Sequence, residues 1–161
     1  MHSRILRLSA TVLASAALSL GIAHAAPYAE GSKVEAFTAK TQHEKEFILK
    51  PAEIRFLLVS HDMETGKKAN AVLTTVGQQN LADKKVVYLA NIHGMPGIGR
   101  MFALPKMRRY AHTIILGDSE VLIARFPEQK EKVTVLKLDD GKVTSIQYWS
   151  PGVDPLDNVL K

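Results

Sequence analysis

Two histidines and a carboxylate follow two apolar segments of strand length, and these are ligand types for a metal ion. His61 and Asp62 follow the first segment, and His93 follows the second. Because parallel strands place their carboxyl ends at one edge of a sheet, the three side chains could converge there, with Glu64 as a further ligand for zinc or copper. The spacing matches no metal signature such as His-Glu-x-x-His, so the sequence favours exposed polar residues that cap strand ends and predicts no metal.

A glycine-rich loop after the second apolar segment could approach a phosphate. It contains Gly94, Gly97 and Gly99, and Arg100 follows directly. A dinucleotide-binding loop needs Gly-x-Gly-x-x-Gly after the first strand of its unit, whereas this loop reads Gly-x-x-Gly-x-Gly, contains Pro96 and follows an interior strand. A conformationally demanding loop is therefore favoured over flavin or nucleotide binding, and an anion such as phosphate stays an open alternative.

Nucleophilic catalysis has no support in this sequence. Ser60, His61 and Asp62 are adjacent, and adjacent residues on a strand point to opposite faces, so they cannot form a relay in that order. The 161 residues contain no cysteine, which excludes thiolate chemistry.

Positive charge is scattered along the chain. The formal net charge is +5 at pH 7, and the one local basic cluster consists of Lys106, Arg108 and Arg109 with Tyr110 beside it. A nucleic-acid surface needs a larger patch with interleaved aromatic residues, so we expect a solvated helix face and no nucleic-acid partner.

The first 25 residues have the pattern of a secretory signal. Arg4 and Arg7 precede the apolar stretch 8–22, and Ala23-His24-Ala25 supplies the small-x-small cleavage pattern. We expect cleavage after Ala25 and a soluble periplasmic chain of residues 26–161 without a membrane span, the alternative being an uncleaved anchor. No cysteine follows the stretch, so a lipid anchor is excluded.

The chain beyond the signal is predicted to alternate strands and helices in one domain. Apolar runs at 54–60 and 85–92 predict two parallel strands covered on both faces. Between them, apolar residues at i, i+3, i+4 and i+7 predict a helix that Asp62 or Thr65 caps and Gly77 ends. Further predictions are an extended arm from 31 to 38, a strand at 46–49, a helix through Met101, Phe102, Leu104 and Met107 that Pro105 kinks or restarts, a turn at His112, strands at 113–117 and 121–126, and a hairpin of 133–138 with 143–149 around Asp140-Gly141.

The element order resembles that of thioredoxin-like domains. More narrowly, the stretches Met95-Pro96-Gly97-Ile98-Gly99-Arg100-Met101-Phe102 and Val133-Thr134-Val135-Leu136-Lys137-Leu138-Asp139-Asp140-Gly141-Lys142-Val143 are similar to those of YtfJ-type periplasmic proteins, whose activity is not established. The resemblance implies an α/β, thioredoxin-like fold, a single domain with a central mixed sheet flanked by helices.

The chain departs from the redox members of that fold at both halves of their active site. Where they carry Cys-x-x-Cys, this chain reads His61-Asp62-Met63-Glu64-Thr65-Gly66-Lys67, and where they carry a proline it reads Lys130-Glu131-Lys132-Val133. We therefore expect a secreted, non-redox binding or accessory module without a resident cofactor, whose partner is a periplasmic protein or a small ligand. The alternative is a flavin-linked or metal-dependent oxidoreductase, with its site at His61, Asp62, His93, Gly94, Gly97, Gly99 and Arg100.

Overall fold

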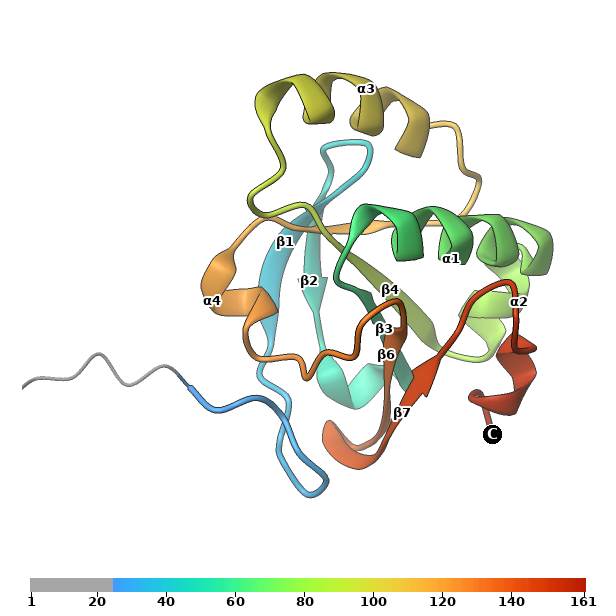
Figure 1. The fold of residues 1–161 in the computed structure, drawn as a ribbon. Coiled ribbons are helices and arrows are strands. Elements are labelled where there is room, and N and C mark those ends of the chain that lie inside the picture. Colours follow the sequence, from blue (N-terminus) through green and yellow to red (C-terminus); the bar gives the residue numbers. More distant parts are fainter. Residues whose placement is uncertain (1–24) are drawn as a thin grey trace, which may run out of the picture.

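The computed structural model describes residues 25–161, so the predicted signal segment lies outside the described residues except for Ala25. Figure 1 shows a central sheet with helices on both faces. The elements in chain order are β1 (Phe37–Thr41), β2 (Glu46–Leu49), the 3-10 turn Pro51–Glu53, β3 (Phe56–Ser60), α1 (Met63–Val76), α2 (Gln78–Asp83), β4 (Val86–Asn91), α3 (Gly97–Met107), β5 (Ile115–Gly117), α4 (Glu120–Ile123), β6 (Val133–Asp139), β7 (Lys142–Trp149) and the 3-10 turn Leu156–Asn158.

The sheet has seven strands in the order β2-β1-β5-β4-β3-β6-β7. β3 pairs with β4 in parallel, as predicted, and with β6 in antiparallel, so β3 lies well inside a mixed sheet. The predicted β6–β7 hairpin is also confirmed, and its turn residues Asp140 and Gly141 both have positive φ, at 45° and 76°.

Alternate residues of β3 enter two separate cores, which explains its continuous apolar sequence. Phe56 and Leu58 pack on the face covered by α1, while Leu57 and Val59 pack on the face covered by α4 and the N-terminal arm. Because both faces are buried, every position of the strand is apolar except Ser60 at its end.

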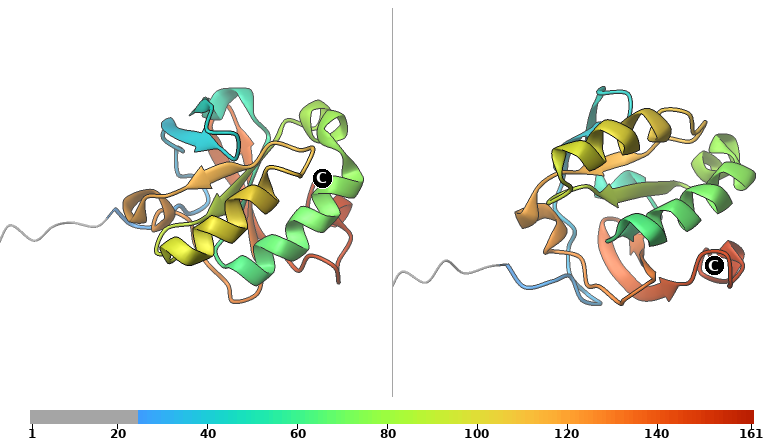
Figure 2. Two further views of the ribbon diagram at one scale, coloured as in Figure 1. Left: turned by 90° about the horizontal axis from the view of Figure 1, so that it is seen from above. Right: turned by 45° about the horizontal axis from the view of Figure 1, so that its top comes forward.

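The predictions for α1 are confirmed in detail. Asp62 is its N-cap, Gly77 ends it, and Ala69 and Leu73 are fully buried against the sheet. Figure 2 shows that α3 runs beside α1 in the same direction, on the same side of the sheet. No helix among residues 25–161 is long and apolar enough to cross a membrane.

Three local predictions can be compared with the structure. Residues 121–126 do not form a strand, because Ser119 accepts a hydrogen bond from the backbone of Leu122 and caps the short helix α4. His112 lies in a bend shortly before β5, consistent with the predicted turn, and its side chain is fully buried. Pro105 does not start a second helix, because α3 runs without interruption from Gly97 to Met107 with Pro105 in its last turn.

Candidate functional site

The junction of β3 and α1 is organised around Asp62. Its Oδ1 accepts a hydrogen bond from the Thr65 backbone at 2.8 Å, and its Oδ2 accepts one from the Thr65 hydroxyl at 2.6 Å. Burial alone would raise the pKa of Asp62, but these hydrogen bonds outweigh it and hold the pKa below its usual value. Asp62 is therefore an ionised helix cap, and both its oxygens are engaged.

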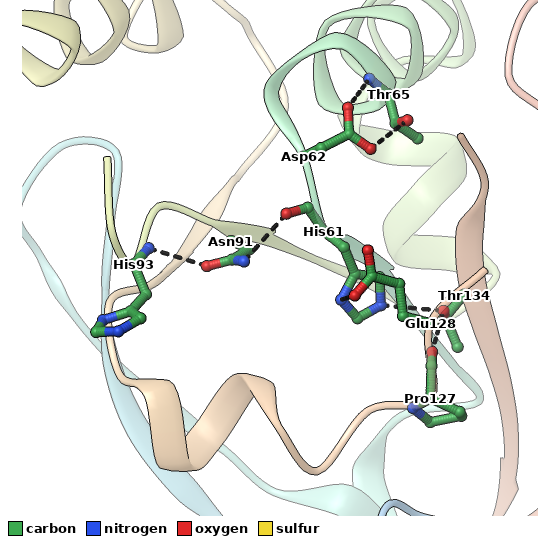
Figure 3. A network of polar contacts seen from close by, with 8 residues as sticks. All are labelled: His61, Asp62, Thr65, Asn91, His93, Pro127, Glu128 and Thr134. Carbon is green, nitrogen blue, oxygen red and sulfur yellow. Dashed lines mark hydrogen bonds and ion pairs between the residues drawn. The ribbon is translucent and has the colours of Figure 1, made fainter. Parts of the chain in front are cut away.

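His61 points away from Asp62, into the body of the protein (Figure 3). Its Nε2 lies 3.1 Å from the hydroxyl of Thr134, which donates its own proton to the carbonyl of Pro127. The hydroxyl must therefore accept from Nε2–H, which leaves Nδ1 unprotonated and 4.0 Å from Glu128. Burial lowers the pKa of His61, so the ring is neutral, and the expectation of an exposed strand end is wrong for this residue.

The three candidate metal ligands His61, Asp62 and His93 do not surround a common point (Figure 3). The His93 ring is exposed and lies 4.0 Å from Glu120. Asn91 holds the two strand ends instead, because its Nδ2 donates to the His61 carbonyl at 3.0 Å and its Oδ1 accepts from the His93 backbone at 2.9 Å. Within residues 25–161, no three His, Asp or Glu side chains are grouped so that they could hold a metal ion.

The glycine-rich loop is closed by Arg100. The guanidinium donates to both oxygens of Asp118, at 2.5 and 2.6 Å, and to the carbonyls of Ile92 and Met95 at 3.0 and 3.1 Å. The hydrogen bonds with Arg100 hold the pKa of Asp118 below its usual value. Arg100 thus stabilises its own loop, and its charge is already compensated by Asp118 rather than free for an anion.

Each glycine of that loop has a different environment. Gly94 has a positive φ of 75°, which other residues adopt with strain. Gly97 begins α3, so the loop is shorter than the sequence predicts. A Cβ on Gly99 would lie 3.2 Å from Cγ of Met95, so this glycine allows Met95 to pack against the first turn of α3.

A cavity of about 320 Å³ lies between α1 and α3, above the carboxyl ends of β3 and β4. We call it the α1–α3 cavity. Its lining is mostly apolar, and α3 contributes no fully buried residue, although Met107 near its end packs against the core. Its apolar side chains include Met63, Ile92, Met95, Phe102, Ala103 and Met107.

The sequence analysis missed most of the residues that line this cavity. The chain has five methionines, and three of them, Met63, Met95 and Met107, meet here from different segments. Methionine side chains are flexible and polarisable, and they are common where a surface accepts apolar ligands. On α1, Met63, Gly66, Lys67 and Asn70 follow at i, i+3, i+4 and i+7, a second helix face beside the buried one.

Comparison with solved structures places the fold in the thioredoxin-like class. The chain is similar to a peroxiredoxin-like protein from Aquifex aeolicus, with a TM-score of 0.55 and 12% identity over 85% of this chain and 86% of that one. It is also similar to a putative electron transfer protein from Aquifex aeolicus VF5, with a TM-score of 0.54 and 15% identity over 82% and 96% of the two chains. Peroxidoxin BcpB from Mycobacterium tuberculosis matches with a TM-score of 0.51 and 13% identity over 74% and 84%.

These similarities define a fold and not an activity. No protein family model matches the chain, and no curated protein matches it significantly. The fold class predicted from the sequence, thioredoxin-like with a mixed sheet in one domain, is confirmed. Because the chain has no cysteine, thiol-disulfide exchange through its own residues is not supported.

Proposed function

We propose that the protein is a non-redox thioredoxin-like binding module of the periplasm, which takes a small apolar ligand into the α1–α3 cavity. The cavity itself carries this proposal. At about 320 Å³ it falls in the size range of ligand sites, about 300 to 1,000 Å³, and it is mostly apolar with a few polar groups. Its place at the carboxyl ends of β3 and β4 is where open α/β sheets generally hold ligands. Export rests on the signal pattern of residues 1–25.

The alternative of a flavin-linked or metal-dependent activity has less support. It requires His61, His93 and Arg100 to face a shared ligand. His61 is bonded to Thr134, His93 lies beside Glu120, and Arg100 is paired with Asp118.

Binding of an environment-sensitive dye tests the proposed function. We expect N-phenyl-1-naphthylamine to bind saturably, with one site per chain and increased fluorescence. Ala103→Phe fills the cavity from α3 and should weaken binding by about tenfold or more. Ala82→Phe adds the same side chain to an exposed position of α2, a helix that lines no part of the cavity, and should leave dye binding unchanged. Thermal unfolding of both variants verifies that they fold.

Two results would contradict the proposal. One is an absence of saturable dye binding, and the other is equal loss of binding in the two variants. Native against denaturing mass spectrometry of periplasmic protein adds an independent measurement, since a retained ligand appears as mass that denaturation removes.

A further inference from the structure

Asn70, a largely buried polar residue of the α1–α3 cavity, has a side-chain donor without a partner among the described residues. Asn70 is 5% exposed and lines the cavity. Its Oδ1 accepts a hydrogen bond from Nε2 of His112 at 2.9 Å, which fixes the orientation of the amide. Its Nδ2 donates to no group in the described part of the chain. This nitrogen is open to the cavity, because no fully buried side-chain nitrogen among residues 25–161 lacks a partner. A ligand that covers Asn70 would remove water from this donor, so the site favours a ligand that carries an oxygen there.

The Ser60 hydroxyl is a second potential donor in the lining of the cavity. The hydroxyls of Ser60 and Tyr88 are 2.8 Å apart, and only one of them can donate to the other. Burial raises the pKa of Tyr88, so its hydroxyl stays protonated, and Ser60 is the one of the two that lines the cavity. When the Tyr88 hydroxyl donates to the oxygen of Ser60, the Ser60 hydroxyl is left to donate its own proton to an acceptor in the cavity. Gly66 permits this arrangement, since a Cβ there would lie 3.3 Å from Oγ of Ser60.

Two lysines add positive charge to the cavity, one from each helix. Lys67 lies one turn before Asn70 on α1, and Lys106 lies near the end of α3. Within residues 25–161, neither ammonium group has a carboxylate within 4.0 Å. Asn70 lies near the end of α3 that carries Lys106, because its partner His112 packs against Tyr110, which follows α3 and also lines the cavity.

The opposite end of the cavity is apolar and acidic. Met63 lies there at the beginning of α1 and Met95 two residues before α3, together with the carboxylates of Asp62 and Glu64. A carboxylate on the ligand would be repelled by Glu64 and attracted by the lysines, so the charges of the lining favour one orientation.

From these contacts, and on the basis of the proposed function, we propose that the cavity binds monocarboxylic acids with an unbranched apolar chain of about eight to ten carbons. The carboxylate accepts hydrogen bonds from Asn70 and lies between Lys67 and Lys106, and the chain extends toward Met63 and Met95. The length follows from the volume, because about 320 Å³ holds about ten groups the size of a water molecule, at about 30 Å³ each.

Three probes with the same chain separate charge from hydrophobicity: sodium decanoate, decanol and decylammonium chloride. Methionine methyl groups labelled with ¹³C report the binding. The signals of Met63, Met95 and Met107 should shift on titration with decanoate, while Met101, which is 67% exposed and does not line the cavity, serves as the internal control. We expect decanoate to bind about tenfold tighter than decanol and decylammonium to bind weakest.

Variants test the assigned contacts. Lys67→Gln and Lys106→Gln should each weaken decanoate binding by about three- to tenfold and leave decanol binding unchanged. Lys68→Gln is the matched control, because Lys68 is the neighbouring exposed lysine and does not line the cavity. Asn70→Asp keeps the acceptor for His112 but replaces the free donor by an anionic oxygen, so it should weaken decanoate binding more than either lysine variant.

The outcomes distinguish the two proposals. Equal binding of decanoate and decanol, or stronger binding of decylammonium, would overturn the carboxylate assignment and leave the apolar binding module standing. An unchanged decanoate affinity in both lysine variants and in Asn70→Asp would also overturn it. If none of the three probes shifts the methionines of the cavity, the proposed function itself is refuted.

Discussion

The burial of His112 makes the stability of the fold depend on pH. Its side chain is 1% exposed, and its Nε2 must carry a proton, because it donates to Oδ1 of Asn70. The ring packs between Tyr88 and Tyr110, at centroid distances of 6.3 and 5.5 Å. Burial disfavours the charged ring and lowers the pKa of His112 from 6.5 to about 4.

The sign of the effect follows from proton counts. Between these two pKa values the unfolded chain holds a proton on this ring and the native protein does not, so the free energy of unfolding falls as the pH falls. With these pKa values, the loss is about 2 kcal/mol between about pH 7.5 and pH 5 and approaches about 3 kcal/mol in stronger acid. This contribution is fully present above the unfolded pKa.

Urea unfolding measures this contribution directly. Trp149 is the single tryptophan and is fully buried, so its fluorescence reports unfolding. His112→Gln keeps a donor for Asn70 and removes the titrating ring, so its free energy of unfolding should vary less with pH, by about 2 kcal/mol over the same interval. His43→Gln, at an exposed histidine, is the control.

The comparison with wild type isolates His112. The buried His61, whose pKa is also lowered, contributes with the same sign in wild type and variant alike, and its effect cancels in the difference. Parallel curves for wild type and His112→Gln between pH 7.5 and pH 5 would refute the reasoning.

Three further substitutions test structural roles assigned above. Asp62→Ala removes the cap of α1 and should lower the free energy of unfolding by about 1 kcal/mol, whereas an unchanged urea midpoint would contradict the cap. Asp118→Asn should lower the free energy of unfolding by less than about 1 kcal/mol, because the pair with Arg100 is partly exposed. It should also speed amide hydrogen exchange in residues 94–99, and unchanged exchange there would show that Arg100 does not stabilise the loop. Gly141→Ala would place an alanine at a φ of 76° and its Cβ 3.2 Å from that of Pro51. The free energy of unfolding should therefore fall by about 1 to 2 kcal/mol, as measured by thermal unfolding. An unchanged stability would show that the hairpin turn rearranges.

The fold was predictable where sequence patterns have one physical solution. The continuous apolar run of β3 requires cover on both faces, and the Asp140-Gly141 turn supplies the two positive φ values of a tight hairpin. The strand prediction for residues 121–126 was wrong because a short apolar segment fits a strand or a helix equally well. In the structure, Ser119 caps this segment and stabilises a helix, and hydrophobic periodicity takes no account of such a local contact.

The site was less predictable, because it depends on side-chain direction. The carboxyl ends of two parallel strands indicated that His61, Asp62 and His93 could converge. This convergence does not occur, because the His61 side chain turns into the body of the protein while that of Asp62 caps α1. Asn70 carried no signal of its own, since its role follows from a cavity between two helices and from a buried histidine 42 positions away. The clustering of methionines around α1 and α3 was the one signal that could have found the cavity.

His112 links the stability of the fold to the proposed ligand site without making binding depend on its own protonation. In the native state an added proton enters at Nδ1, which lies 3.5 Å from the hydroxyl of Thr74, and Nε2 continues to donate to Asn70. The Asn70 amide therefore keeps its orientation whether the ring is neutral or charged. Decanoate affinity should then stay constant from pH 7.5 to pH 5.5, while the free energy of unfolding already falls. Calorimetric titration would measure the affinity and urea unfolding the stability, both at the same pH values. If affinity instead declined in parallel with stability, the native ring would already be taking up a proton in this interval, which would contradict the lowered pKa of His112.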